Sequence, residues 1–175
     1  MYDFDLTQTS SIALQLDTDL REDFVAYTYV LSSYFVAYTY SLSSDVVMVS
    51  PFVDHLMRWI NGLRVMDGTE VDIEVALREA LLNAIIHGNR EDPRKHVYLT
   101  ILCDANREIS IVIRDEGLGF DGSSIPDPTA PAHRMSTHGR GIYLMRALMD
   151  EVSFEEGGTV LYMRKGRSSH PYRSQ

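Results

Sequence analysis

Apolar residues recur along this chain with two different periods, and these periods predict its helices and strands. Residues 46–63 and 71–87 place apolar side chains every three or four positions, which is typical of amphipathic helices that bury one face. Residues 96–103 and 108–114 alternate apolar and polar side chains on either side of a turn at 104–107, as half-buried strands of a hairpin do. The pattern therefore predicts two helices followed by two strands.

The start of the first helix carries two competing signals. Ser44 and Asp45 can accept hydrogen bonds from the free N–H groups of a first turn and so cap a helix there. Pro51 is tolerated in the first turn of a helix but not in its interior. The proline therefore favours a helix that begins near Ser50.

The C-terminal third of the chain predicts a loop, a helix and a strand. Residues 120–138 contain three prolines and no periodicity, so we expect a long loop of the kind that forms lids or binding segments. A helix is expected from 141 to about 149, and a last strand from 159 to 164 after a pair of glycines. We expect 167–175 to be a flexible tail.

A tandem duplication precedes the helices. The ten residues 24–33 are repeated at 35–44 with one change, from Val30 to Ser41, and both copies have the β-branched and aromatic composition of strands. The offset of 11 is odd, so sliding one copy onto the other's place along a continuous strand would reverse its faces. We expect a hairpin turning at 32–34 to avoid that conflict.

We interpret the duplication as a copying event that lengthens one edge of the sheet. The second copy leads directly into the first helix, so it is expected to occupy the usual first-strand position. The first copy is then expected to extend the sheet as a hairpin or to pair with another chain, because an unpaired edge strand of this composition invites aggregation.

Length and composition indicate one compact domain. The chain has 175 residues, of which 45% are hydrophobic, so it can bury a sizeable core but is short for two. We expect residues 1–23 to form an N-terminal arm and residues 24–166 to form the domain. The formal charge of −9 and the pI near 5.0 argue against a general nucleic-acid surface, which needs a basic stripe.

The sequence also predicts where the protein works. It contains no run of about eighteen apolar residues, so nothing is expected to span a membrane. Its N-terminus is acidic where a signal peptide would be basic and then apolar. Cys103 is the only cysteine, so no internal disulfide can form, and we expect a buried thiol in a cytoplasmic protein.

Candidate chemistry begins on the second predicted helix. Glu79, Asn83 and His87 are spaced by four, so a regular helix lines them along one face. The amide oxygen of Asn83 suits magnesium, which prefers hard oxygen ligands, and Glu79 is placed to accept a proton. Taken alone, this arrangement is also that of an ordinary exposed polar stripe. His87, with no second histidine or cysteine beside it, is expected to hydrogen-bond at the helix end rather than bind zinc.

Two glycine motifs add a possible nucleotide site. Asp115 follows a predicted strand and can accept a hydrogen bond from the exocyclic amine of adenine, while Gly117 and Gly119 let backbone approach a flat ring. Gly139 and Gly141 precede a helix whose free N–H groups favour phosphate. Each motif alone is compatible with a simple turn or a loop-to-helix junction.

The order of these motifs resembles a known family. Glu79-x-x-x-Asn83, Asp115-x-Gly117-x-Gly119, Gly139-x-Gly141 and Gly158-Thr159 are similar to the N, G1, G2 and G3 boxes of the GHKL ATPase superfamily. Within it, residues 35–165 resemble the anti-sigma factor serine kinases of bacterial partner-switching systems. The resemblance implies an α+β fold, a two-layer α/β sandwich with a mixed, mainly antiparallel sheet and helices on one face. It also implies a lid between the G1 and G2 boxes.

The resemblance assigns a role to each matching residue. ATP and Mg²⁺ are the implied cofactors, with Asn83 as the metal ligand, Glu79 as the base that activates a target serine, and His87 nearby at the cofactor site. Asp115 is implied to bind adenine, helped by Thr159 through water. The remaining implied contacts are the adenine side for Gly117 and Gly119, and the phosphates for Gly139 and Gly141.

One position departs from the family pattern. Kinases of this family carry an arginine just before the G2 glycines that reaches the terminal phosphate, and here Thr137 and His138 hold that place. Arg134, earlier in the loop, and Arg140, between the glycines, are the candidates to replace it.

Three functions compete on this basis. The first is a serine kinase that binds a sigma factor, phosphorylates a STAS-type anti-anti-sigma protein and forms a homodimer. The second is a non-catalytic module that uses its nucleotide state to choose between protein partners. The third, the detached ATP-binding half of a sensor histidine kinase, is disfavoured because no room remains for a dimerising phosphoacceptor hairpin and His55 is a lone candidate.

Overall fold

The computed structural model describes the chain in five segments. These are residues 24–32, 35–62, 68–104, 106–119 and 140–166. The expected N-terminal arm, the loop at 120–138 with Arg134, the residue Gly139 and the expected tail lie outside them.

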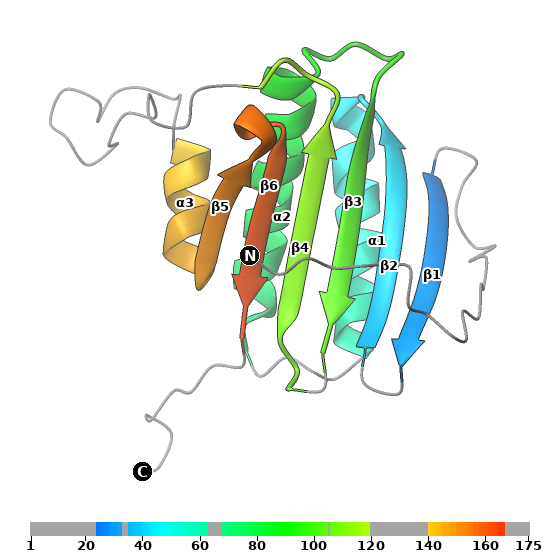
Figure 1. Cartoon of the computed structure of the whole chain (residues 1–175), viewed down its shortest axis with the longest axis vertical. Coiled ribbons are helices and arrows are strands. Elements are labelled where there is room, and N and C mark those ends of the chain that lie inside the picture. Colours follow the sequence, from blue (N-terminus) through cyan, green and yellow to red (C-terminus); the bar gives the residue numbers. More distant parts are fainter. Residues whose placement is uncertain (1–23, 33–34, 63–67, 105, 120–139, 167–175) are drawn as a thin grey trace, which may run out of the picture.

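The described strands form one six-stranded sheet in the order β1-β2-β3-β4-β6-β5 (Figure 1). The strands are β1 (Phe24–Ser32), β2 (Phe35–Ser43), β3 (His96–Cys103), β4 (Ile109–Asp115), β5 (Glu151–Glu155) and β6 (Val160–Lys165). Every pairing among them is antiparallel, so the mixed sheet that the resemblance implied is wholly antiparallel in the described residues. The chain passes through two helices between β2 and β3 and returns to the end where β2 finished, where Ser44 N donates to Lys95 O at 3.1 Å.

The helices are α1 (Val49–Gly62), α2 (Glu70–Leu82) and α3 (Arg140–Leu148). Figure 1 shows α1 and α2 behind the sheet and α3 at the edge beside β5, and α3 packs against α2. This arrangement confirms the two-layer α+β architecture. None of the helices in the described segments is long and apolar enough to cross a membrane. Both start signals of the first helix are used: Asp45 Oδ1 accepts Val47 N at 2.9 Å and caps a 3-10 turn, η2 (Val46–Met48), after which α1 begins just before Pro51.

The core lies between the sheet and the helices because the strands alternate buried and exposed positions. Cys103, 6% exposed, is one of these buried positions, as expected. Trp59 is only partly buried and packs against Tyr38 of β2, with ring centroids 4.1 Å apart. The fully buried side chains include Tyr40, Leu42, Phe52, Leu56, Ile60, Ile73, Leu77, Leu81, Ile85, Leu99, Ile101, Ile109 and Ile111.

The sequence pattern did not predict β5. This strand has only five residues, with a glutamate at each end, so its alternation is too short to stand out. Val152 and Phe154 pack against the core from the sheet edge. The turn η6 (Glu156–Gly158) then leads into β6, with Gly157 at φ +66° and Gly158 at φ +93°.

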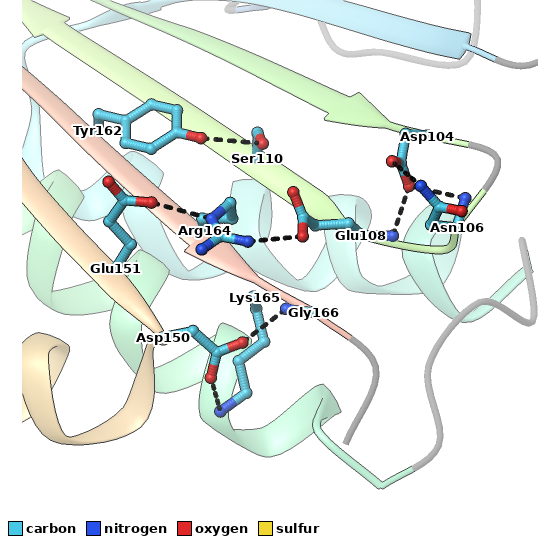
Figure 2. A network of polar contacts seen from close by, with 10 residues as sticks. All are labelled: Asp104, Asn106, Glu108, Ser110, Asp150, Glu151, Tyr162, Arg164, Lys165 and Gly166. Atoms are coloured by element: carbon cyan, nitrogen blue, oxygen red, sulfur yellow. Dashed lines mark hydrogen bonds and ion pairs between the residues drawn. The ribbon is translucent and has the colours of Figure 1, made fainter. Parts of the chain in front are cut away.

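Ion pairs connect neighbouring elements at the end of the sheet that lies away from the start of α3 (Figure 2). Arg164 lies between Glu108 and Glu151, at 2.7 and 2.9 Å, and these side chains belong to β6, the β3–β4 connection and β5. Lys165 Nζ lies 3.0 Å from Asp72 on α2 and donates to Leu148 O, the last carbonyl of α3. Such contacts are individually worth little at a surface, but together they hold the C-terminal end of α3 to the sheet.

The duplicated segment forms the expected hairpin, with β1 antiparallel to β2. The expectation that a hairpin avoids the face conflict is wrong. Tyr38 is paired with Thr28, whereas its equivalent in the first copy is Tyr27, which is paired with Thr39. Directly paired positions share a face, so equivalent positions of the two copies lie on opposite faces of the sheet. The hairpin therefore does not remove the effect of the odd offset of 11 residues between the two copies.

The second copy supplies the strand next to the core, as predicted. Along its length β2 pairs with β3, and Tyr40 and Leu42 are 1% and 0% exposed, with the Tyr40 ring edge-on to Phe52 at 5.1 Å. We therefore expect deletion of residues 24–34 to leave a chain that folds and binds ATP. At most, we expect a change in its oligomeric state, which light scattering measures. Loss of cooperative unfolding, followed by Trp59 fluorescence, would mean that the first copy is integral to the core.

A second deletion serves as a matched control. Removing residues 34–44 instead leaves the same sequence, except that valine replaces serine at the position of Ser41. Ser41 lies on the face of β2 opposite Tyr40 and is only partly buried. Since either copy can then lead directly into the first helix, both shortened chains should unfold at nearly the same temperature.

Candidate functional site

The predicted motifs meet at one end of the sheet. At this end β4 finishes, β6 begins, α3 begins, and α2 runs into η3 (Asn83–Gly88), a π-helical turn (Figure 1). Segments more than sixty residues apart in the chain therefore supply one site, and its residues come from element ends, where side chains and free backbone groups are accessible.

The start of α3 packs on the polar face of α2. A Cβ atom placed on Gly141 would lie 2.6 Å from Glu79 Oε2 and 3.3 Å from Asn83 Nδ2, so the glycine lets the start of α3 approach these two side chains closely. Glu79 and Asn83 are both partly exposed. An acidic group, an amide oxygen and a helix N-terminus thus share one small region, which suits a phosphate chain and a hard cation.

Asp115 is held between two glycines at the other side of the site. Its Oδ1 accepts the N–H of Gly117 at 2.8 Å, and a Cβ atom on Gly88 would lie 2.4 Å from its Cγ. A Cβ atom on Gly117 would lie 2.3 Å from Gly88 O. Burial raises the pKa of the Asp115 carboxyl, while the Gly117 N–H and Lys95 act to lower it. Among the described residues, Oδ2 has no hydrogen-bond donor, so it can accept one from a ligand.

Gly119 and Thr159 lie beside this carboxylate. Gly119 has φ +72°, and a Cβ atom on it would lie 2.1 Å from Gly157 O and 3.3 Å from Thr159 Cγ2. The N–H of Asp115 donates to Thr159 O at 3.0 Å. Thr159 Oγ1 donates to Glu156 O at 3.0 Å, which leaves its lone pairs to accept a further hydrogen bond.

Two further predicted residues, His87 and Arg140, are exposed at the same end of the sheet. The regular helical spacing of Glu79, Asn83 and His87 is interrupted after Asn83, because η3 is a wider π-helical turn. His87 is exposed at the end of this turn. Arg140 is exposed as the first residue of α3. Local π-helical turns are frequent at functional sites.

The sequence reasoning gave no site role to three residues that build the site. Gly88 is the last residue of η3, Asn89 follows it, and Glu116 follows Asp115. Gly88 leaves room for the Asp115 carboxylate. The Asn89 side chain donates a hydrogen bond to His96, 7 residues away in the sequence, and accepts one from Glu116, 27 residues away. No local pattern announces such long-range contacts. A polar residue directly after a helix end was the one available signal.

Comparison with known proteins identifies the family. A model of the histidine kinase-like ATPase domain matches residues 42–165 of the chain. The chain belongs to this family. The match runs from the end of β2 to the end of β6 and includes every described site residue.

Curated relatives carry related names. The Anti-sigma F factor of Geobacillus thermodenitrificans is 30% identical over 126 residues, which cover 68% of this chain and 80% of that protein. The Anti-sigma F factor of Priestia megaterium is 31% identical over 101 residues, 54% of this chain and 67% of that protein. The Serine-protein kinase RsbW of Bacillus subtilis is 33% identical over 101 residues, 54% of this chain and 62% of that protein. The resemblance drawn from the motifs is confirmed.

Proposed function

We propose that this protein is an ATP-dependent anti-sigma factor serine kinase. It binds a sigma factor and phosphorylates a STAS-type anti-anti-sigma protein, as part of a partner-switching pathway in the cytoplasm. Residues 24–166 are its single ATP-binding domain, and two chains form a homodimer. The names of the relatives and the ATPase family support this function.

One observation carries the proposal: Glu79, Asn83 and Gly141 meet across two helices, at the same end of the sheet as Asp115 and its two glycines. A Cβ atom added to Gly141 would lie 2.6 Å from Glu79 Oε2 and 3.3 Å from Asn83 Nδ2. A merely solvent-exposed polar stripe would not lie against a helix N-terminus, whose free N–H groups favour phosphate.

The donor set fits ATP with magnesium. Asn83 offers an amide oxygen to the metal without adding charge against the triphosphate, and the Asp115 carboxylate offers Oδ2 to the adenine amine. Asn83 would hold the magnesium, which would supply positive charge to offset the charge of the phosphates. The first N–H groups of α3, at Gly141, would face the phosphate chain.

Glu79 would act on the acceptor. The serine oxygen of the antagonist forms a bond to the terminal phosphorus, the bond to the ADP oxygen breaks, and the hydroxyl proton passes to the Glu79 carboxylate. Glu79 belongs to the rigid α2 helix and lies beside Gly141, so it can meet a hydroxyl that approaches the phosphate from outside.

Incubation with labelled ATP tests the reaction. The protein, ATP with magnesium, and candidate STAS-type proteins should yield phosphoserine on one of them and ADP in equal amount. Label transfer to a serine-to-alanine variant of the same antagonist should be absent. If ATP binds and no antagonist is phosphorylated, the function as a kinase is wrong.

A non-catalytic module is the second candidate, and the Thr137-His138 departure favours it. It predicts that sigma-factor binding differs between the ATP-bound and ADP-bound states while no phosphoserine forms. Arg134→Ala and Arg140→Ala separate the two candidates, because in a kinase one of them should lower the rate of phosphotransfer without changing sigma-factor binding.

Asp115→Asn is expected to weaken ATP binding about 5- to 150-fold. The substitution keeps the size of the side chain but replaces one acceptor oxygen by a donor, and an unpaired buried polar group costs about 1–3 kcal/mol. Titration with a fluorescent ATP analogue measures the effect. Asp92→Asn, on an exposed turn after Asn89, is the control and should bind normally. Unchanged affinity of the Asp115 variant would remove this residue from the site.

A further inference from the structure

We propose that Asn89 is a positioning residue for adenine recognition: its buried amide fixes the backbone that follows Asp115 and thereby directs the carboxylate oxygen that accepts the adenine amine. The inference rests on the proposed function, because it assumes ATP at this site. It assigns a role to a side chain that touches no nucleotide itself.

The side-chain amide of Asn89 is buried, and both its nitrogen and its oxygen form hydrogen bonds. The side chain is 1% exposed. Its Nδ2 donates to His96 O at the start of β3, at 2.9 Å, and its Oδ1 accepts the N–H of Glu116 at 2.8 Å. The backbone N–H of Asn89 donates to Ala84 O at 2.8 Å, which anchors the residue to η3. A buried amide with partners of this kind holds its neighbours in one arrangement.

These contacts lead directly to the carboxylate. Glu116 lies between Asp115 and Gly117, so the bond from its N–H to Asn89 holds the peptide that joins Asp115 to Glu116. The next peptide supplies the Gly117 N–H, which donates to Asp115 Oδ1 at 2.8 Å, so the carboxylate is bonded to the turn that starts at the held peptide. With Oδ1 occupied, Oδ2 is the oxygen left to accept a hydrogen bond from a ligand.

A second set of contacts holds the same turn from outside. The Glu116 carboxylate accepts His96 N at 2.8 Å and the Tyr98 hydroxyl at 3.2 Å. These bonds fix the Glu116 side chain to β3, whereas its backbone N–H is held, among the described residues, by Asn89 alone. Loss of the Asn89 amide should therefore let the turn at Glu116 rotate while the strands stay paired.

Nucleotide choice separates positioning from a purely structural role. ITP differs from ATP at the position of the exocyclic amine, where it carries an oxygen. If Asn89 directs Asp115 Oδ2 toward that amine, Asn89→Ala should weaken ATP binding by at least about fivefold and leave ITP binding nearly unchanged. A general loosening of the fold would weaken both nucleotides alike and leave the ATP-to-ITP preference of the wild type intact.

The experiment measures Kd for ATP and ITP, with magnesium, in the wild type and in Asn89→Ala. Asn106→Ala, an exposed asparagine at the far end of the sheet, is the matched control and should keep the wild-type preference. Asn89→Asp retains an acceptor for the Glu116 N–H and should retain most of the preference. In the Asp115→Asn background, Asn89→Ala should cause no further loss of preference, since both changes act through one carboxylate.

Each result has one meaning. A wild type that binds no ATP contradicts the proposed function, whereas a wild type that binds ATP and ITP equally contradicts adenine-amine recognition and this inference with it. An Asn89→Ala protein that keeps the full preference overturns the role of Asn89. If that variant does not fold, the same ratio is read from Asn89→Ser, and a full preference there overturns it equally.

Discussion

Glu79→Ala is expected to lower phosphotransfer by about 10²–10⁴-fold, which is the usual contribution of a general base. ATP affinity should stay nearly the same, because a base acts on the acceptor hydroxyl during the reaction and contributes little to ground-state binding. The fold should also persist, since Glu79 is partly exposed and does not belong to the buried core.

Single-turnover phosphorylation of the antagonist and nucleotide titration measure the two quantities separately. Glu74→Ala, one helical turn before Arg78 and paired with it at 2.9 Å, is the matched control and should phosphorylate at nearly the normal rate. In Asn83→Ala, by contrast, ATP affinity itself should fall, through loss of the magnesium-dependent part of binding. Normal phosphotransfer by Glu79→Ala would mean that the base lies elsewhere.

Gly117→Ala is expected to lower both the stability of the fold and the affinity for nucleotide. The new methyl group would lie 2.3 Å from Gly88 O and 2.6 Å from Asp115 Oδ1, so backbone and carboxylate must both move. Overpacking of this kind costs about 1–3 kcal/mol of stability. Displacement of the adenine anchor adds a similar loss in binding, so ATP affinity should fall by roughly 30-fold or more.

Thermal unfolding and ATP titration test this pair of effects. Gly62→Ala is the control, because nothing lies within 4 Å of its Cβ position at the end of α1. It should bind ATP normally and unfold at the same or a slightly higher temperature, since alanine favours a helix by about 1 kcal/mol over glycine. Wild-type affinity in Gly117→Ala would show that the turn tolerates a shift away from Gly88.

The spacing of apolar residues was enough to predict the helices and strands that bury one face. The second helix and the strands β3, β4 and β6 begin and end within a few residues of the sequence prediction, because each carries several apolar residues at the period of its own structure. The short edge strand β5 was missed, since only Val152 and Phe154 face the core. The regular helix expected through His87 instead becomes a π-helical turn after Asn83.

The sequence by itself determined which residues are the candidates for the chemistry. Glu79, Asn83, Asp115 and Gly141 stand in motifs whose order alone indicated the ATPase family, because a nucleotide requires particular groups at particular element ends. Covalent spacing is enough to place such groups at the start or end of an element.

Only the tertiary structure decided how those groups meet. The start of α3 reaches Glu79 across more than sixty residues, and Asn89 joins two turns through hydrogen bonds that no local pattern records. The tertiary structure also placed the second copy of the duplicated segment in the core and set its equivalent positions on opposite faces from those of the first. Packing and register depend on contacts between distant segments, so their energies are settled only when the whole sheet and its helices assemble.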